Sequence, residues 1–500
     1  MSRRSAYSLY LIYSGVASFL FAVAYTVANV YRVEAAGLSP LQLVLVGTTL
    51  EVTYFLFNVP TGVVADTISR RLSVIVGVAL WGVGLALEGS LPRFGAILLA
   101  QVLGGLGYTF VEGALEAWLS DEIGEDRFGP ALLRGGQVGR VAGFVGIGVS
   151  VGLASVGLGL PLVAAGVGFL LFAGVLLAMM REPRFQRPPR VAASGMIGRS
   201  RAALGAMGET ARVGALAARG RPLARTILAV AALFGGFSEG FDRLWEVQFL
   251  MTIGLPALGA LNPVVWFGII EAVALLLGIA AAEGLRRFDP ERPAVAVRVL
   301  GALEAVLLVG VVLFALAGSF AWAVVAYWLA ATARGLVSPV YAAWINRGID
   351  PRVRATVLSL SGQADALGQF TVGPAIGGVG SLFGLRAALT TAGLALAPAV
   401  ILYGRSIGRT GRGRGDQHGH ARVIDGTARR DVLMVDKRTV GEDTDVANQI
   451  APIERRRRIG LLRRPAAAAR SSIKTYPMAL ILSGAITMTT RIWSRPPYQG

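Results

Sequence analysis

Long runs of apolar residues recur along most of this 500-residue chain, and short polar segments separate them. Each run has the length of about 20 residues that an α-helix needs to cross a bilayer core of about 30 Å. The pattern predicts an all-α membrane protein with twelve transmembrane helices, at about residues 7–30, 40–63, 72–91, 95–119, 130–157, 160–180, 226–252, 262–284, 297–317, 320–344, 354–379 and 384–403.

Composition supports this interpretation and excludes several kinds of site. Only 16% of the residues are charged, whereas soluble domains carry about 25%. The 65 glycines favour close helix–helix contact in lipid. The chain has no cysteine and two histidines, His418 and His420, both outside the predicted spans. We therefore expect no disulfide, no metal site and no bound cofactor.

Basic residues predict the orientation in the membrane. The formal charge of +18 does not indicate nucleic acid, because the basic residues concentrate in alternate loops and in the C-terminal tail. One set of loops holds Arg3, Arg4, Arg70, Arg71, Arg127, the stretch 181–225, Arg286, Arg287, Arg347, Arg352 and Arg354. The opposite loops hold little beyond Arg32, Arg93 and Arg386. Since positive loops stay inside, both termini are expected to be cytoplasmic. The Arg-, Gly- and Ala-rich composition points to a bacterial plasma membrane.

The chain divides into two similar parts. The expected organisation is an N-terminal six-helix half at 1–180, a basic cytoplasmic central loop at 181–225, a C-terminal half at 226–403 and a basic, disordered cytoplasmic tail at 404–500. An offset of 226 residues aligns Ala117, Trp118, Ile123, Leu132, Gly136, Gln137 and Phe144 with the identical Ala343, Trp344, Ile349, Leu358, Gly362, Gln363 and Phe370. Such parallel repeats are typical of secondary transporters, and we expect two pseudo-symmetric halves in a monomer.

Charged residues inside the predicted spans are the candidates for function, because each costs about 2.5–3.5 kcal/mol at the bilayer centre. The seventh span carries Glu239, Asp242, Arg243 and Glu246 on one helical face. One arginine cannot neutralise three carboxylates, so protons or cations from other helices must complete the set. Two interpretations remain: the face lines a cavity, or Glu239 and Arg243 form an i,i+4 pair that only helps insertion.

Other charges divide by their depth. Glu51, Glu271 and Asp365 fall near the middle of their spans, where a proton and substrate cavity is expected. Glu112, Glu116 and Arg140 lie nearer the cytoplasmic side and are interpreted as a structural ion-pair cluster. The excess of acid over base favours a lipophilic cation, or protons, as cargo.

The stretch GVVADTISRR, between spans two and three, resembles the signature of the major facilitator superfamily. Gly62, Asp66, Arg70 and Arg71 match its glycine, acid and basic pair, whereas Thr67 and Ser69 replace a basic residue and a second glycine; the resemblance covers residues 1–403. It implies the major facilitator fold and a cytoplasmic latch for the outward-open state, in which Asp66 engages the other half. By symmetry the partner is expected near the start of span eleven, at Arg354.

Within that family the chain resembles drug exporters only in part. Gln101 is present in span four, but Leu98 stands where those exporters often have an arginine. Their Gly-Pro signature is absent from span five, while a similar string, Gly373-Pro374-Ala-Ile-Gly377-Gly378, occurs in span eleven.

The resulting expectation is a secondary active transporter that exports small lipophilic or cationic compounds (drug efflux) by proton antiport with alternating access. Its partners would be the lipid bilayer, a small-molecule substrate and protons. The alternatives are a proton-coupled uptake permease for a small metabolite and a non-transporting sensor or scaffold on the same fold. The chain has no Walker loop and no Ser/His or Cys/His set in the spans, so we expect no enzyme.

Overall fold

The computed structural model describes residues 3–185, 205, 222–257, 265–285, 293–348 and 351–405. Within these ranges all regular structure is helical, so the predicted all-α fold is confirmed. Most of the predicted central loop and nearly all of the predicted tail at 404–500 lie outside the described residues.

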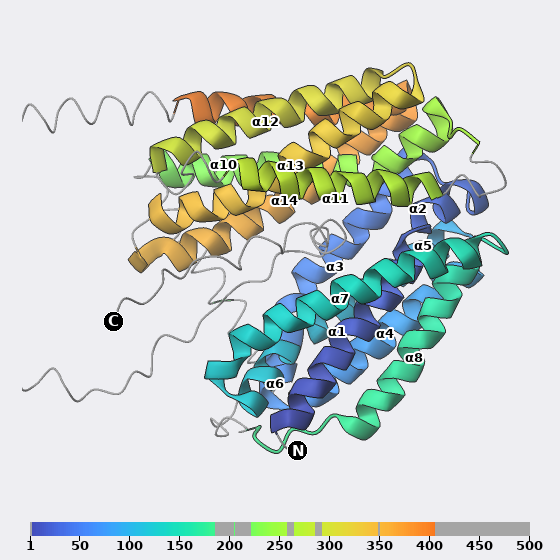
Figure 1. The fold of residues 1–500 in the computed structure, drawn as a ribbon, viewed down its shortest axis with the longest axis vertical. Coiled ribbons are helices and arrows are strands. Elements are labelled where there is room, and N and C mark those ends of the chain that lie inside the picture. The colour runs from blue at the N-terminus through green and yellow to red at the C-terminus, as the bar shows by residue number, and fades with distance from the viewer. Residues whose placement is uncertain are drawn as a thin grey trace, which may run out of the picture. The chain divides into compact units, whose positions relative to one another are not determined.

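The helices of the first half follow the chain in order. They are α1 (Arg3–Tyr25), α2 (Ala28–Val30), the π-helix η1 (Tyr31–Ala35), α3 (Pro40–Thr67), α4 (Arg70–Ser90), α5 (Phe94–Val111), α6 (Ala114–Ile123), α7 (Glu125–Ala154) and α8 (Leu160–Met179). Local sequence explains some boundaries: Ser39 and Gln42 form a capping box before Pro40 at the start of α3. Figure 1 shows α1, α4, α7 and α8 side by side, with α1 packed on α7 and α4 on α8.

The second half repeats this arrangement. It contains α10 (Pro222–Gln248), the π-helix η2 (Phe249–Ile253), α11 (Val265–Leu285), α12 (Pro293–Leu316), α13 (Phe320–Gly348), α14 (Pro351–Phe383) and α15 (Leu385–Leu394). Here α10 packs on α14 and α12 on α15. The starts of α7 and α14, Glu125 and Pro351, differ by the 226 residues of the sequence repeat.

Eleven helical stretches in the described ranges are long and apolar enough to cross a membrane. The first ten predicted spans and the twelfth each coincide with such a stretch. The helix α14 occupies the position of the predicted eleventh span. This 33-residue helix is not among the eleven stretches, and its sequence carries Arg352, Gln363, Asp365 and Gln369 among apolar residues. The count of twelve spans therefore stays a prediction.

Two ends of the helix bundle need names. We call the end with residues 66–71 the basic-loop face, and the end with Gly37 and Gly254 the short-loop face. Both glycines follow a π-helix, and both have a positive φ, 63° for Gly37 and 82° for Gly254. Since glycine adopts this conformation without a steric penalty, the first helix of each half can end in the same way.

The first span is longer than the sequence pattern suggested. Arg32 was expected in a loop, but it belongs to η1, where only 2% of the residue is exposed. Its guanidinium is buried against a carboxylate of α4, so hydropathy alone ended this span too early. Arg32 therefore belongs to the helical stretch Arg4–Ala35, which is long and apolar enough to cross a membrane, and does not count toward the loop charges.

The contact between α10 and α14 depends on glycines, which have no side chain. A Cβ at Gly235 would overlap the carbonyl oxygen of Asp365, and a Cβ at Gly368 would overlap that of Ala232. The two backbones therefore touch directly, as small residues allow in membrane helices.

We predict that Gly368→Ala destabilises the protein, because the added methyl group forces α10 and α14 apart. Overpacking of this kind costs about 1–3 kcal/mol, and thermal unfolding in detergent measures it. Gly378→Ala on the same helix is the control, since a Cβ there meets no atom within 4 Å. Equal melting temperatures for the two variants would contradict the prediction.

Candidate functional site

A buried cluster of charges lies where α3 of the first half meets α10 of the second. Glu239 accepts a hydrogen bond from the Nε of Arg243 at 3.2 Å, and Gly47 of α3 lies directly against both side chains. Glu51, one helical turn beyond Gly47, lies within electrostatic range of the pair. Glu51 and Glu239 are only 2% and 1% exposed. The structure thus brings together three of the residues predicted for the cavity.

This cluster holds more acid than base. Within the described part of the chain, one oxygen of Glu51 (Oε1) and one of Glu239 (Oε2) are buried without a hydrogen-bond partner. Arg243 reaches Glu239, so at least one further proton or cation is needed to satisfy the carboxylates. A site of this composition attracts positive charge.

Asp242 and Glu271 lie in the second half and have their own partners. Asp242 makes a two-pronged ion pair with Arg334 of α13, with a distance of 2.7 Å from Nη2 to Oδ2. Glu271 of α11 accepts a 2.5 Å hydrogen bond from the hydroxyl of Tyr327. These contacts tie α10, α11 and α13 together, so within span seven Asp242 pairs with another helix, whereas Glu239 and Arg243 pair with each other.

Glu246 of α10 and Asp365 of α14 lie on either side of the central cluster. Glu246 lies within hydrogen-bonding reach of Asn29 in α2, nearer the short-loop face. Asp365 of α14 accepts a hydrogen bond from Gln369 at 2.8 Å. A Cβ on Gly373, two turns along α14, would contact Glu239 at 2.8 Å, so α14 also borders the central cluster.

Glu112, Glu116 and Arg140 were predicted to form an ion-pair cluster. Glu112 accepts hydrogen bonds from the hydroxyl of Tyr54 and from Asn58, the latter at 3.1 Å. It thereby ties the end of α5 to α3, while Glu116 lies on α6 and Arg140 on α7. Their role as an ion-pair cluster stays a prediction.

The latch residues at the basic-loop face contact their own half. Arg70 pairs with Asp121 of α6, donates to the carbonyl of Ala117 at 3.1 Å, and approaches Asp66 to 3.8 Å. The side chain of Asp66 is 70% exposed, and a Cβ on Gly62 would meet no atom within 4 Å. The side chain of Arg354, the expected partner of Asp66, lies outside the described residues.

Residues 181–185, which we call the strap, fold back over this face. Trp118 donates to the carbonyl of Arg181 at 2.9 Å, and Arg184 pairs with Glu122 at 2.8 Å. Glu182 accepts hydrogen bonds from the hydroxyl of Ser69 and from the backbone N–H of Arg71. Since Ser69 also caps α4 by accepting from Leu72 at 3.0 Å, the strap completes the N-terminus of that helix.

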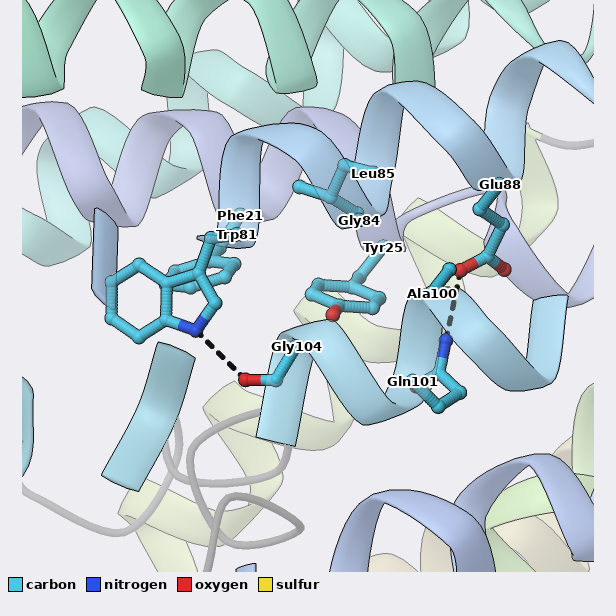
Figure 2. A pocket seen from close by; sticks show the side chains of 9 residues that line it. All are labelled: Phe21, Tyr25, Trp81, Gly84, Leu85, Glu88, Ala100, Gln101 and Gly104. Carbon is cyan, nitrogen blue, oxygen red and sulfur yellow. Dashed lines mark hydrogen bonds between the residues drawn. The ribbon is translucent and has the colours of Figure 1, made fainter. Parts of the chain in front are cut away.

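A second buried polar group lies near the short-loop face. Arg32 pairs with Glu88 of α4 at 2.8 Å, and Gln101 of α5 donates to the other oxygen of Glu88 at 2.8 Å. Figure 2 shows Gln101 pointing at Glu88 beside a small cavity, into which the hydroxyl of Tyr25 also points. The cavity of about 10 Å³ has room for roughly one water molecule. The sequence analysis assigned no role to Glu88, and the signal that was missed is a carboxylate inside the predicted span 72–91.

Comparison with known proteins identifies the family. The family model described as "Major Facilitator Superfamily" matches residues 9–371. The chain is a member of the major facilitator superfamily. This major facilitator protein is therefore a multi-pass membrane protein and a secondary transporter.

Individual relatives are more distant. A 98-residue stretch is 30% identical to an uncharacterized MFS-type transporter, YxaM, of Bacillus subtilis, and this match spans 25% of that protein. Among solved structures, a bacterial homologue of the human lysosomal transporter Spinster, inward-facing and unoccupied, is 18% identical, with a TM-score of 0.58 over 80% of this chain and 96% of that chain. The POT family transporter PepTSo is 15% identical, with a TM-score of 0.60 over 82% and 99%. The nucleoside transporter NupG is 14% identical, with a TM-score of 0.56 over 80% and 98%. At these identities the structures share the fold.

We predict that Ser69→Ala destabilises the first half more than Ser69→Gly does. Loss of an N-cap to alanine costs about 1 kcal/mol, and loss to glycine only a few tenths. Thermal unfolding in detergent measures the difference. Ser155→Ala is the control, because its exposed hydroxyl donates to the carbonyl of Gly152, three residues earlier in the chain, and caps no helix N-terminus. Unfolding of both Ser69 variants at the wild-type temperature would refute the capping role.

Proposed function

We propose that this transporter exports small lipophilic or cationic compounds by proton antiport, with alternating access to the two sides of the membrane. In this proposal it works as a monomer in a bacterial plasma membrane, with the basic-loop face and both termini in the cytoplasm. The observation that carries the proposal is the acid excess of the cluster formed by Glu51, Glu239 and Arg243.

The cluster lies at the contact between the two halves, which is where a transported cation could be released by a relative movement. Arg243 pairs with Glu239 and lies within electrostatic range of Glu51, and each carboxylate retains a buried oxygen without a partner among the described residues. A proton or an organic cation would satisfy these oxygens in turn. Competition between the two for the same carboxylates is the simplest physical basis for exchange.

The distribution of contacts along α3 supports alternating access. Pro40, Leu41 and Val44, near the short-loop face, lie against Gly377, Gly380 and Ser381 of α14, and Phe55 lies against Phe370 with their ring centroids 5.7 Å apart. Farther along the helix, Gly62 faces open space. Among the described residues, α3 therefore contacts the second half from the short-loop face as far as Phe55, and in this proposal Asp66 acts as a latch in the other conformation of the cycle.

We predict that Glu239→Gln abolishes proton-driven transport while the protein still folds, because the amide cannot exchange a proton. The measurement is quenching of a cationic dye taken up by everted vesicles after acidification of their interior. Glu34→Gln, which removes an exposed carboxylate from η1, is the matched control and should transport at the wild-type rate.

Two outcomes would contradict this proposal. Full dye accumulation with Glu239→Gln would exclude that residue as the exchange site. Accumulation of no compound from a broad cationic panel by the wild-type protein, together with proton-driven uptake of a metabolite into right-side-out vesicles, would replace export by the permease alternative.

We also predict that Asp66→Asn lowers the transport rate several-fold without changing thermal stability. The pair with Arg70 is exposed and 3.8 Å long, and such pairs contribute about 0–1 kcal/mol. A role in the other conformation would therefore affect turnover alone. Thr67→Ala, which removes a hydroxyl bonded to the carbonyl of Val63 at 2.7 Å, is the neighbouring control. A wild-type rate for Asp66→Asn would remove Asp66 from the latch.

A further inference from the structure

The Arg32–Glu88 ion pair is one of the most completely buried in the described part of the chain. The side chains of Arg32 and Glu88 are 3% and 1% exposed. Arg32 also donates from Nη1 to the side-chain oxygen of Asn29 at 3.2 Å. Its remaining nitrogen, Nη2, is buried and reaches no acceptor among the described residues. An arginine in this position pays a desolvation cost that its contacts do not fully offset.

The second half shows that the fold does not need this pair. In the first half, the hydroxyl of Tyr31 donates to the carbonyl of Glu88 at 2.5 Å, which ties η1 to the last turn of α4. In the second half, Gln248 donates to the carbonyl of Ala315 at 3.1 Å and ties the start of η2 to the last turn of α12.

The residues that follow Tyr31 and Gln248 differ in chemical character: one is charged and the other is aromatic. After Tyr31 comes Arg32, whereas after Gln248 comes Phe249, which packs on Phe314 with ring centroids 5.3 Å apart. The same architecture is therefore closed by apolar packing in one half and by an ion pair in the other. Since apolar replacements of buried ion pairs are often neutral or stabilising, Arg32 and Glu88 need a reason other than stability.

The second half offers Arg32 another carboxylate. Asn29, which accepts from Arg32, belongs to α2, and α2 packs on α10. Asn29 lies within hydrogen-bonding reach of Glu246 on α10, and Arg32 lies within electrostatic range of it. The Oε2 of Glu246 is buried and has no partner within the described ranges. Within the described part of the chain, Asn29 thus lies between two residues that each keep an unsatisfied atom: Arg32, with a free donor in the first half, and Glu246, with a free acceptor in the second.

We propose that Arg32, Asn29 and Glu246 form the polar contact that closes the short-loop face, and that Glu88 and Gln101 hold the Arg32 charge when this contact opens. The inference rests on the proposed alternating access. Glu88 stays beside Arg32 in both conformations, so separation of the halves never leaves the guanidinium unpaired in the membrane. Glu246 adds attraction only when the halves meet, which makes it the residue that biases the equilibrium.

The absence of cysteine from the chain permits a direct test. Val44 is fully buried between α3 and α14, so a Val44→Cys reporter in membranes should react slowly with a membrane-impermeant maleimide added at the short-loop face. Adding Glu246→Gln should raise the labelling rate by about 5-fold or more, because a coupling contact between two states is typically of this size. Glu34→Gln, on the same face but exposed, is the control and should leave the rate unchanged.

Two further variants separate this role from simple support of the fold. In the Val44→Cys background, the double variant Arg32→Gln/Glu246→Gln should be labelled no faster than whichever of the two single variants is labelled faster. Arg32→Lys should keep the slow labelling rate. If Glu246→Gln does not fold, Asn29→Ala carries the same expectation. A folded Glu246→Gln or Asn29→Ala protein that labels at the wild-type rate overturns the proposal. No cargo enters this measurement, so its outcome is independent of whether the protein exports cationic compounds.

Discussion

The cost of placing charge in a hydrocarbon environment governs the internal structure of this transporter. Three arginines inside the helix bundle lie against carboxylates: Arg32 against Glu88, Arg243 against Glu239 and Arg334 against Asp242. The Arg32–Glu88 and Arg334–Asp242 pairs join different helices, whereas Arg243 and Glu239 pair within α10, so two of the three pairs connect elements that apolar packing alone would leave free to slide. The carboxylates that remain in excess, led by Glu51, lie at the contact between the halves, where an exchangeable positive charge has a use.

Pseudo-symmetry makes the asymmetric residues informative. Both halves pack their first helix on their fifth through close backbone approach, and both end that first helix in a π-turn followed by a glycine. Against this shared framework, the ion pair of the first half and the aromatic contact of the second half are alternative ways of filling one position. A buried ion pair costs desolvation energy, and here the second half fills the same position without one. This comparison is better evidence of selection for function than a buried charge considered alone.

Much of this could be predicted from the sequence, and the failures have physical causes. Apolar run length located the helices, and the match of Trp118 with Trp344 fixed the offset that the starts of α7 and α14 reproduce. The proximity of Glu51 to Glu239 followed from their depth in the membrane. Arg32 was assigned to a loop because hydropathy averages cannot detect a carboxylate 56 residues away. The strap was missed for the same reason, since the contacts of Glu182 with Ser69 and Arg71 cross more than 100 positions.

The strap also bears on the order in which the protein is made. Its contacts, from Trp118 to Arg181 and from Glu122 to Arg184, lie entirely within the first half. Residue 185 leaves the ribosome before any part of α10, and domains generally fold as units from the N-terminus. The first half can therefore close its basic-loop face during synthesis, and the second half would insert beside a neighbour that is already complete.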